Sequence, residues 1–299
     1  MSAIAAAEGL RLRSGYFGDR RAFLALAGLL EDTFDIDIRL VDRFGGPDPT
    51  SMPFGYFDTN GRCVANFSAV SIPLMIDGRP VRAVGYQSGA VRPEFRGKGL
   101  YRDLMRRAFA WAEMQDFELG ILLTDKPALY EPYGFRALPQ HVFRGPAPAG
   151  TSRPTARLLN MEDGGDIALI RRLLPARQPV SSLFAVTGHW IEFPLNACFD
   201  STIRLSHIPG LDAIVAWRSG EGAFELLDIV ACEIPPFGAV VGALGIEQSP
   251  IAVHFPPDRL EWKSYQPEVY RGACDLMIRP MRPVKMPDRP FQLPPTAEF

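Results

Sequence analysis

The 299-residue sequence has few residues of the types that bind metals or form disulfides. Its four cysteines, Cys63, Cys198, Cys232 and Cys274, are widely spaced and form no Cys-x-x-Cys pair, and the four histidines are scattered. We therefore expect neither a metal site nor a disulfide framework. Reduced thiols are typical of a cytoplasmic protein, and this is the expected location.

Long apolar runs and a net charge of one sign are also lacking. No apolar stretch approaches the length of a membrane span, and Ala3 to Ala7 is too short and lacks the basic residues of a secretory signal. The formal net charge of −2 favours neither nucleic acid nor a membrane as a partner. With 47% apolar residues, the chain is long enough for one large or two ordinary globular domains.

The most informative segment is residues 91–101, Val-Arg-Pro-Glu-Phe-Arg-Gly-Lys-Gly-Leu-Tyr. It joins a strand-like run (81–91) to a helix-like run (100–114). A glycine-containing turn that enters a helix leaves backbone N–H groups unpaired at the positive end of the helix dipole. The segment therefore predicts a binding site for phosphate or pyrophosphate.

Glycines alone are equally common in plain turns, so the neighbouring charges decide between a plain loop and an anion site. Arg92, Arg96 and Lys98 surround this turn with positive charge. Two familiar nucleotide loops do not fit. The segment lacks the upstream glycine and the hydroxyl residue after Lys98 that the Walker pattern requires. It also has Arg102 where the dinucleotide pattern requires its third glycine.

Residues 96–101 instead resemble the pyrophosphate loop of the GNAT superfamily of N-acetyltransferases, Arg/Gln-x-x-Gly-x-Gly/Ala, with Tyr101 at the sixth position. Downstream, residues 128–135 (Ala-Leu-Tyr-Glu-Pro-Tyr-Gly-Phe) resemble the Tyr-x-x-x-Gly-Phe segment of that family. Two motifs in this order are much harder to obtain by chance than either one alone.

The resemblance implies an α/β (α+β) fold with a mixed, mostly antiparallel central sheet. The order of predicted elements agrees with it. We expect helices at 20–30, 36–44, 100–114 and 126–133, and strands at 10–12, 54–57, 62–75, 81–91, 119–124 and 135–143.

A Pro/Gly-rich stretch, Gly145 to Gly150, marks a candidate boundary, after which a similar order of elements recurs loosely. We expect helices at 165–174, 181–193 and 236–244, and strands at 156–159, 201–207, 212–217, 224–230 and 251–254. After the strand 224–230, the segment Cys232 to Ala239 has one glycine and no arginine, so this second copy is not expected to bind the cofactor.

This tandem layout resembles the enhanced intracellular survival family of acetyltransferases. We predict a catalytic GNAT domain at 1–148 and a degenerate GNAT-like domain at 149–279. The last residues, 280–299, are proline-rich and are expected to form an extended tail.

The resemblance also implies acetyl-CoA as co-substrate, with no metal, and direct transfer of its acetyl group to a primary amine of a small molecule. The predicted cofactor-binding residues are Val91, Arg92, Pro93, Arg96, Gly97, Lys98, Gly99, Leu100 and Tyr101. The backbone N–H of Val91 is the implied donor to the thioester carbonyl. Ordinary sheet pairing of this strand is the alternative, and it requires no special residues.

The general acid implied by the resemblance is Tyr130, which stands at the tyrosine position of the family motif. A phenol with a pKa near 10 matches the basicity of a departing thiolate. Tyr130 as an ordinary core aromatic is the structural alternative. Tyr133 lies on nearly the same helix face and is the local rival.

The general base has no obvious candidate, because residues 86–89 (Tyr-Gln-Ser-Gly) lack the glutamate that many acetyltransferases carry there. In the enhanced intracellular survival family the terminal carboxylate reaches the active site, and Phe299 ends this sequence. The resemblance therefore implies the Phe299 carboxylate as the base. The missing glutamate favours an alternative function, a non-catalytic acyl-CoA-binding regulatory module.

We expect the amine site between the first helices and the sheet, with Phe34, Phe54 and Tyr56 among its walls. Asp35, Asp37 and Asp42 are available to attract a cation, although such carboxylates are more often a solvated helix face. A homo-oligomer is compatible with this organisation.

Overall fold

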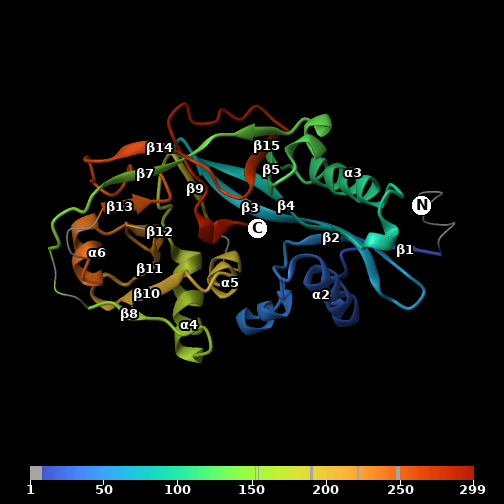
Figure 1. Cartoon of the computed structure of the whole chain (residues 1–299), viewed down its shortest axis with the longest axis horizontal. Coiled ribbons are helices and arrows are strands. Elements are labelled where there is room, and N and C mark those ends of the chain that lie inside the picture. The colour runs from blue at the N-terminus through green and yellow to red at the C-terminus, as the bar shows by residue number, and fades with distance from the viewer. Residues whose placement is uncertain (1–8, 152, 154, 189–190, 221, 247–249) are drawn as a thin grey trace.

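The computed structural model describes residues 9–151, 153, 155–188, 191–220, 222–246 and 250–299, arranged around two sheets (Figure 1). The segment Ala3 to Ala7 lies outside the described residues.

The first sheet holds most strands of the N-terminal half and the site described below. Its order is β1 (Arg11–Ser14), β2 (Met52–Phe57), β3 (Cys63–Ile76), β4 (Arg79–Val91), β5 (Leu119–Thr124), β15 (Asp275–Pro280) and β6 (Arg136–Leu138), and β9 (Phe184–Val186) pairs with the far end of β3.

Two helices, α2 (Arg20–Phe34) and α3 (Leu100–Glu113), cover opposite faces of this sheet. Side chains of α3 share a core with Phe54 and Tyr56 of β2, whereas side chains of α2 pack with Phe57 of the same strand. Because successive strand residues point to opposite faces, β2 contributes to both layers. The short 3₁₀ helices on this half are η1 (Tyr16–Gly18), η2 (Ile38–Phe44), η3 (Pro93–Phe95), η4 (Pro127–Leu129) and η5 (Glu131–Tyr133).

The second sheet has the order β8 (Arg157–Leu158), β10 (Arg204–Ile208), β11 (Ala213–Ser219), β12 (Phe224–Ala231), β13 (Pro250–Val253), β7 (Gln140–Pro146) and β14 (Gln266–Tyr270). The helices of this half are α4 (Gly164–Leu173), α5 (Glu192–Phe199) and α6 (Phe237–Leu244), and its 3₁₀ helices are η6 (Leu174–Ala176) and η7 (Pro209–Leu211).

The two sheets share one topology and exchange a strand. In the first sheet, β4 and β5 are parallel and joined through α3, and β15 lies antiparallel between β5 and β6. In the second, β12 and β13 are parallel and joined through α6, and β7 lies antiparallel between β13 and β14. The same place in each sheet is therefore filled by a strand from the other half of the sequence.

This exchange differs from the predicted domain boundaries. The strand β7 precedes residue 148 but pairs in the second sheet, and β15 precedes residue 279 but pairs in the first. Strand pairing is non-local, and the Pro/Gly-rich stretch at 145–150 begins within β7, so it is not a division between self-contained sheets.

The C-terminal tail (281–299) is extended and ends in the 3₁₀ helix η8 (Pro295–Ala297). Its residues 291–296 are buried, and Phe291 and Leu293 belong to a core cluster with side chains of β3 and β4. The His141 N–H donates to the carbonyl of Phe291 (2.8 Å), and η8 packs against α5. The chain end thus lies near the middle of the molecule (Figure 1).

The helix predicted at 181–193 is wrong. The described part of this segment holds the strand β9, which pairs with β3, and the start of α5 at Glu192; residues 189–190 lie outside the described residues. The short apolar run Leu183-Phe-Ala-Val fits either element by periodicity, and pairing with the edge of β3 decides for the strand.

Candidate functional site

A cavity of about 850 Å³ lies where β4 and β5 separate. The two strands are paired only from Ala83 to Gly85 on β4 and from Leu119 to Ile121 on β5. Beyond this short ladder, residues 86–91 of β4 and 123–124 of β5 border the cavity. The open sheet edge created by this separation is the structural basis of the site.

A β-bulge in β4 accompanies the separation. Ser88 has a left-handed backbone (φ 57°), and the register of β3 with β4 shifts at this point. The buried Asn66 holds the bulge: its side-chain amide donates to the Ser88 carbonyl (2.8 Å) and to Ser68 Oγ (3.0 Å), and it accepts from the Tyr16 hydroxyl (2.5 Å). The bulge is therefore built into the core and is not a feature of a loose edge.

The backbone N–H of Val91 faces the open edge of β4. The next residue, Arg92, donates its N–H to the carbonyl of Val64 (2.9 Å), and Val91 lies opposite Ala65 in the ladder. Neighbouring residues of an antiparallel strand direct their N–H groups to opposite edges. The Val91 N–H consequently points away from β3, toward the side of the cavity.

The glycine loop after β4 exposes backbone N–H groups at the start of α3. Gly97 and Gly99 both have φ 75°, which other residues rarely adopt, and no side chain of the described residues caps α3 at Gly99. A Cβ at Gly97 would meet nothing within 4 Å, so this side of the loop is open. Arg96 borders the cavity, and its Nε donates to the Val91 carbonyl (3.1 Å).

The other predicted cofactor-binding residues lie in different surroundings. Arg92 is buried, and its guanidinium donates to the carbonyl of Cys63 (2.9 Å) and pairs with Asp32 (2.5 Å). Arg92 therefore has structural partners and does not extend the positive charge of the loop. Leu100 is buried in the core, Pro93 begins η3, and the Lys98 ammonium lies 5.1 Å from the centre of the Phe95 ring.

Tyr101 and Tyr130 form a hydrogen-bonded pair of hydroxyls, with 2.7 Å between the two oxygens. Both residues border the cavity. A Cβ at position 89 would collide with the Tyr101 hydroxyl, so Gly89 is required for the tyrosine to lie across β4. The sixth residue of the loop, which departs from the family pattern, thus reaches the tyrosine of the second motif.

Burial raises the pKa of Tyr130, and its hydrogen bond with Tyr101 opposes that rise. Burial also raises the pKa of Tyr101, to well above the ordinary value of a tyrosine. Burial thus favours the protonated form of both hydroxyls, and either one can donate the hydrogen bond between them.

Tyr133, the local rival of Tyr130, does not border the cavity. Its ring packs against Phe109 with 5.5 Å between ring centres. The helix predicted at 126–133 is two successive 3₁₀ turns, η4 and η5, and Tyr130 lies at their junction. This break in the helix turns the two tyrosines in different directions.

Four carboxyl side chains that no sequence motif indicated border the cavity. Asp48, Asp125, Glu192 and Glu298 line it together with Phe299. The Phe299 ring lies against β4, because a Cβ at Gly85 would come within 2.8 Å of it. Glu298 keeps part of its surface open to the cavity, yet the surrounding protein displaces most of its water and raises the pKa of its carboxyl.

The predicted substrate-binding residues divide into one that borders the cavity and two that do not. Phe34 lines it at the end of α2. Phe54 and Tyr56 are wrong as wall residues: both are buried in the core under α3, and the Tyr56 hydroxyl donates to Asp103 (2.7 Å). A strand that is buried on both faces gives no sequence signal of which aromatic side chain faces a cavity.

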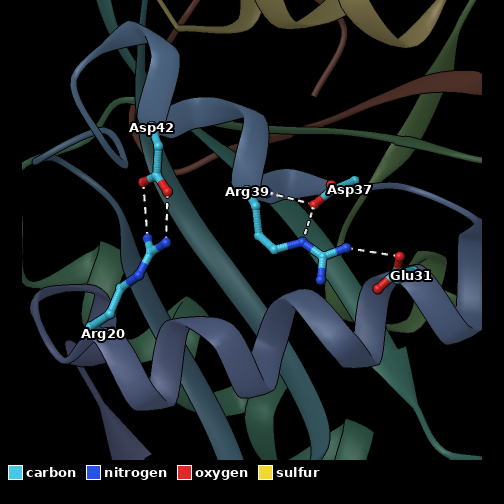
Figure 2. Close-up of polar contacts among 5 residues, drawn as sticks. All are labelled: Arg20, Glu31, Asp37, Arg39 and Asp42. Carbon is cyan, nitrogen blue, oxygen red and sulfur yellow. Dashed lines mark hydrogen bonds and ion pairs between the residues drawn. The ribbon is translucent and has the colours of Figure 1, made fainter.

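The carboxylates expected to attract a cation are engaged with arginines (Figure 2). Asp42 accepts two hydrogen bonds from Arg20, at 2.9 and 2.7 Å. Arg39 bridges Asp37 (2.6 Å) and Glu31 (2.8 Å), and its hydrogen bond holds the pKa of Asp37 below the ordinary value. Asp35 ends α2 in a left-handed conformation. This face is therefore a set of ion pairs on the helices and not an open anionic surface.

Within the ranges that the structure describes, no helix is long and apolar enough to cross a membrane. The same ranges hold no group of three or more His, Cys, Asp or Glu side chains arranged to bind a metal ion.

Residues 49–138 match the family model of the acetyltransferase (GNAT) domain, a span that contains β4, the glycine loop and Tyr130. No curated protein matches the chain by sequence. The family match coincides with the part of the chain that builds the cavity.

Several solved structures resemble most of the chain. One is a conserved protein from Enterococcus faecalis V583 described as a probable N-acyltransferase, with a TM-score of 0.60 and 14% identity over 91% of this chain and 72% of that one. Eis1 from Mycobacterium abscessus has a TM-score of 0.60 and 16% identity over 91% and 73% of the two chains. A GCN5-related N-acetyltransferase from Kribbella flavida has a TM-score of 0.52 and 16% identity over 91% and 72%.

At these identities the structural likeness shows the fold. Together with the domain match, it confirms the predicted GNAT-type α/β fold with mixed sheets and the resemblance to acetyltransferases of the enhanced intracellular survival type. The chain thus has a GNAT-type fold in a tandem arrangement of two sheets, and residues 49–138 match the GNAT domain model.

Proposed function

We propose that the protein is an N-acetyltransferase that moves the acetyl group of acetyl-CoA to a primary amine of a small molecule by direct attack. One observation carries the proposal. A single cavity is bordered by Val91 at the open edge of β4, by Arg96 at the start of the glycine loop, and by the Tyr130 hydroxyl. A thioester transferase requires an anion clamp, a donor to the carbonyl and an acid for the thiolate, and this cavity brings candidates for all three together.

The glycine loop and the open edge of β4 fit coenzyme A chemically. The pyrophosphate is an anion, and the N–H groups of residues 97–100 at the start of a helix, with Arg96 beside them, are suited to bind it. The pantetheine arm carries amide groups, which an unpaired strand edge can hydrogen-bond as a further strand would. The thioester of acetyl-CoA supplies the acetyl group.

The residues of the cavity then have distinct roles. The Val91 N–H binds the carbonyl oxygen as negative charge develops there. The amine nitrogen forms the new C–N bond while the C–S bond breaks, and Tyr130 gives its proton to the departing thiolate sulfur. Since the pKa of Tyr130 is raised, its hydroxyl is fully protonated at neutral pH.

Tyr101 is a positioning residue in this scheme. It holds the Tyr130 oxygen at 2.7 Å and, because its own pKa lies well above the ordinary range, it keeps its proton when Tyr130 gives one up. Its hydrogen bond is therefore strongest in the state that follows proton transfer, which is the condition for it to aid the reaction.

The base that takes the proton of the ammonium group remains a prediction from the sequence, the carboxylate of Phe299. The position of the Phe299 ring against Gly85 supports it, because that glycine ends the β4–β5 ladder at the mouth of the separation. Replacing Glu298 with Gln and deleting Phe299 in separate variants distinguishes the chain end from its neighbour. The proposal requires that only the deletion abolish turnover.

The proposal is tested by incubating the protein with acetyl-CoA and a panel of amines, measuring free thiol and identifying the acetylated amine by mass spectrometry. We expect one thiol for each amine acetylated. Saturable binding of acetyl-CoA with no acetylated product from any amine would instead support the acyl-CoA-binding module.

A further inference from the structure

One part of the cavity is lined by apolar side chains. They come from η1, α2 and η2 and from the start of α5. Phe17, Phe23, Ile38 and Val41 meet Ile191 and Leu195 there, and the same residues form or pack against one core cluster. This part of the cavity is therefore a hydrophobic recess between the two halves of the molecule.

Large apolar side chains are also left exposed at this cavity. Phe34 (49% exposed), Leu129 (42%) and Phe199 (40%) all border it. They come from α2, η4 and α5, which are far apart in sequence. Only seven large apolar side chains of the described residues are exposed, and three of them border this one cavity. A bound apolar group would cover these three side chains.

The recess does not suit a ligand with many positive charges. Four carboxyl side chains border the whole cavity: Asp48, Asp125, Glu192 and Glu298. Asp48 accepts from the Thr50 N–H (2.7 Å), and Asp125 lies 3.3 Å from Lys126. A polyamine or an aminoglycoside would bring further ammonium groups among the apolar side chains of the recess, where burial of a charge is costly, whereas a monoamine places its one charge at the reacting centre.

We infer that the acceptor is a primary monoamine carried on an apolar body, such as an alkylamine or an arylalkylamine. This inference rests on the proposed function. The amine nitrogen lies at the Tyr130 end of the cavity, and the apolar body fills the recess between α2, η2 and α5. The volume of about 850 Å³ leaves room for such a body beside the end of the pantetheine arm.

The experiment measures kcat/KM for acetyl transfer to n-alkylamines from propylamine to hexylamine, to phenylethylamine, to spermidine and to an aminoglycoside. Each methylene added between propylamine and hexylamine should raise kcat/KM about fourfold, because each is buried in the recess. Phenylethylamine is expected to match hexylamine, and both should exceed spermidine at least about tenfold. A flat alkyl series, or a preference for spermidine or the aminoglycoside, would overturn the inference.

Three variants locate the recess. Phe34→Ala and Phe199→Ala should each lower kcat/KM for hexylamine about tenfold and leave that for propylamine within about twofold. The control is Leu24→Ala, because Leu24 is an exposed apolar side chain (41%) on the same helix as Phe34 and does not border the cavity. Equal effects of all three variants would also contradict the inference.

A longer acyl group is the other apolar occupant that this recess admits, and octanoyl-CoA tests it. Faster transfer from octanoyl-CoA than from acetyl-CoA, lost in Phe199→Ala, would assign the recess to the acyl chain and overturn the inference. If no amine is acetylated, calorimetric binding of hexylamine to the complex with CoA separates the two claims. If hexylamine binds and Phe34→Ala weakens that binding, the recess is an amine-binding site although the proposed function fails. If hexylamine does not bind, the inference is rejected as well.

Discussion

The β4–α3–β5 unit of the first sheet and the β12–α6–β13 unit of the second have the same topology. The strand edge exposed where the two strands separate is open in the first unit and covered by other residues in the second. In each, two parallel strands pair over three residues and then separate. In the first unit the separation borders the cavity. In the second, protein fills it. The Gln178 N–H donates to the Ala231 carbonyl (2.8 Å), and Arg177 donates to the carbonyl of Ile229 (3.1 Å).

The loops that follow the two separating strands differ in the same sense. The first has Arg96-Gly-Lys-Gly before a 14-residue helix, and the second has Cys232-Glu-Ile-Pro-Pro before an 8-residue helix. Prolines have no N–H to offer an anion, and Pro236 stands at the N-cap where Gly99 stands in the first loop. One topology therefore yields either an open cavity or a packed core, depending on whether its strand edge is left open.

The largest expected effect comes from separating the two units. A chain ending at residue 148 lacks β15, whose six residues pair with β5, and it leaves β7 without the second sheet. Both defects expose long strand edges, so we expect this fragment to show no cooperative thermal transition and no binding of acetyl-CoA. Calorimetry of the fragment beside the full chain checks this, and a cooperative transition in the fragment would disprove interdependence of the sheets.

The next effect is catalytic. Tyr130→Phe removes the proton donor without changing the packing around the ring, and we expect kcat to fall about 10²–10⁴-fold with the affinity for acetyl-CoA unchanged. Tyr133→Phe is the matched control, since this second tyrosine packs on Phe109 away from the cavity. Equal rates for the two variants would remove Tyr130 from the mechanism.

The filled edge of the second unit is tested through stability. Asp228 is buried at its centre, where it accepts from Arg177 (2.6 Å), from the Ile229 N–H (2.8 Å) and from the Thr296 hydroxyl of the tail (3.0 Å). Asp228→Asn leaves the Arg177 charge buried without its partner and should lower the free energy of unfolding by about 3–5 kcal/mol.

Its control is Asp212→Asn, which breaks an exposed pair with Arg172 and should cost at most about 1 kcal/mol. Chemical denaturation of both variants provides the measurement. Similar losses in the free energy of unfolding would show that the buried Asp228 pair contributes no more to stability than an exposed ion pair.

Tyr101→Phe tests the role of Tyr101, the loop residue that departs from the GNAT pattern. Loss of one hydrogen bond should lower kcat about tenfold. Because that hydrogen bond lowers the pKa of Tyr130, its removal raises this pKa, so the alkaline fall in kcat should move to higher pH. A pH–rate profile that keeps its alkaline limb in place would indicate a purely structural Tyr101.

The smallest expected effect is the response of the second unit to acid. Burial lowers the pKa of His254, which also faces Glu225, Arg218, Arg144 and Gln292. The folded state therefore binds fewer protons than the unfolded state below the ordinary histidine pKa of about 6.5, and stability falls as the pH drops through that value. The pKa of Glu225 is held to about 2, so the loss of its pairing comes only at much lower pH.

Thermal unfolding at pH 7.5 and 5.5 measures this, with His254→Gln as the variant that should reduce the difference. An unchanged difference in the variant would assign the acid response elsewhere.

How much the sequence foretold depends on whether a feature is local. The glycine loop and Tyr130 were predictable because a turn, a helix start and a short motif are encoded within a few residues. The exchange of β7 and β15 was not, because a strand's alternation is the same whichever sheet it joins. Pairing of Asp37 and Asp42 with arginines, and the core position of Tyr56, likewise depend on which residues the fold brings together.

The central claim is that only the open unit binds the co-substrate, and a calorimetric titration with acetyl-CoA tests it most directly. The account predicts one acetyl-CoA per chain, and at least about tenfold weaker binding when Arg96 and Lys98 are both replaced by Ala in a variant with an unchanged unfolding temperature. Two acetyl-CoA molecules per chain, or unchanged affinity in that variant, would contradict it.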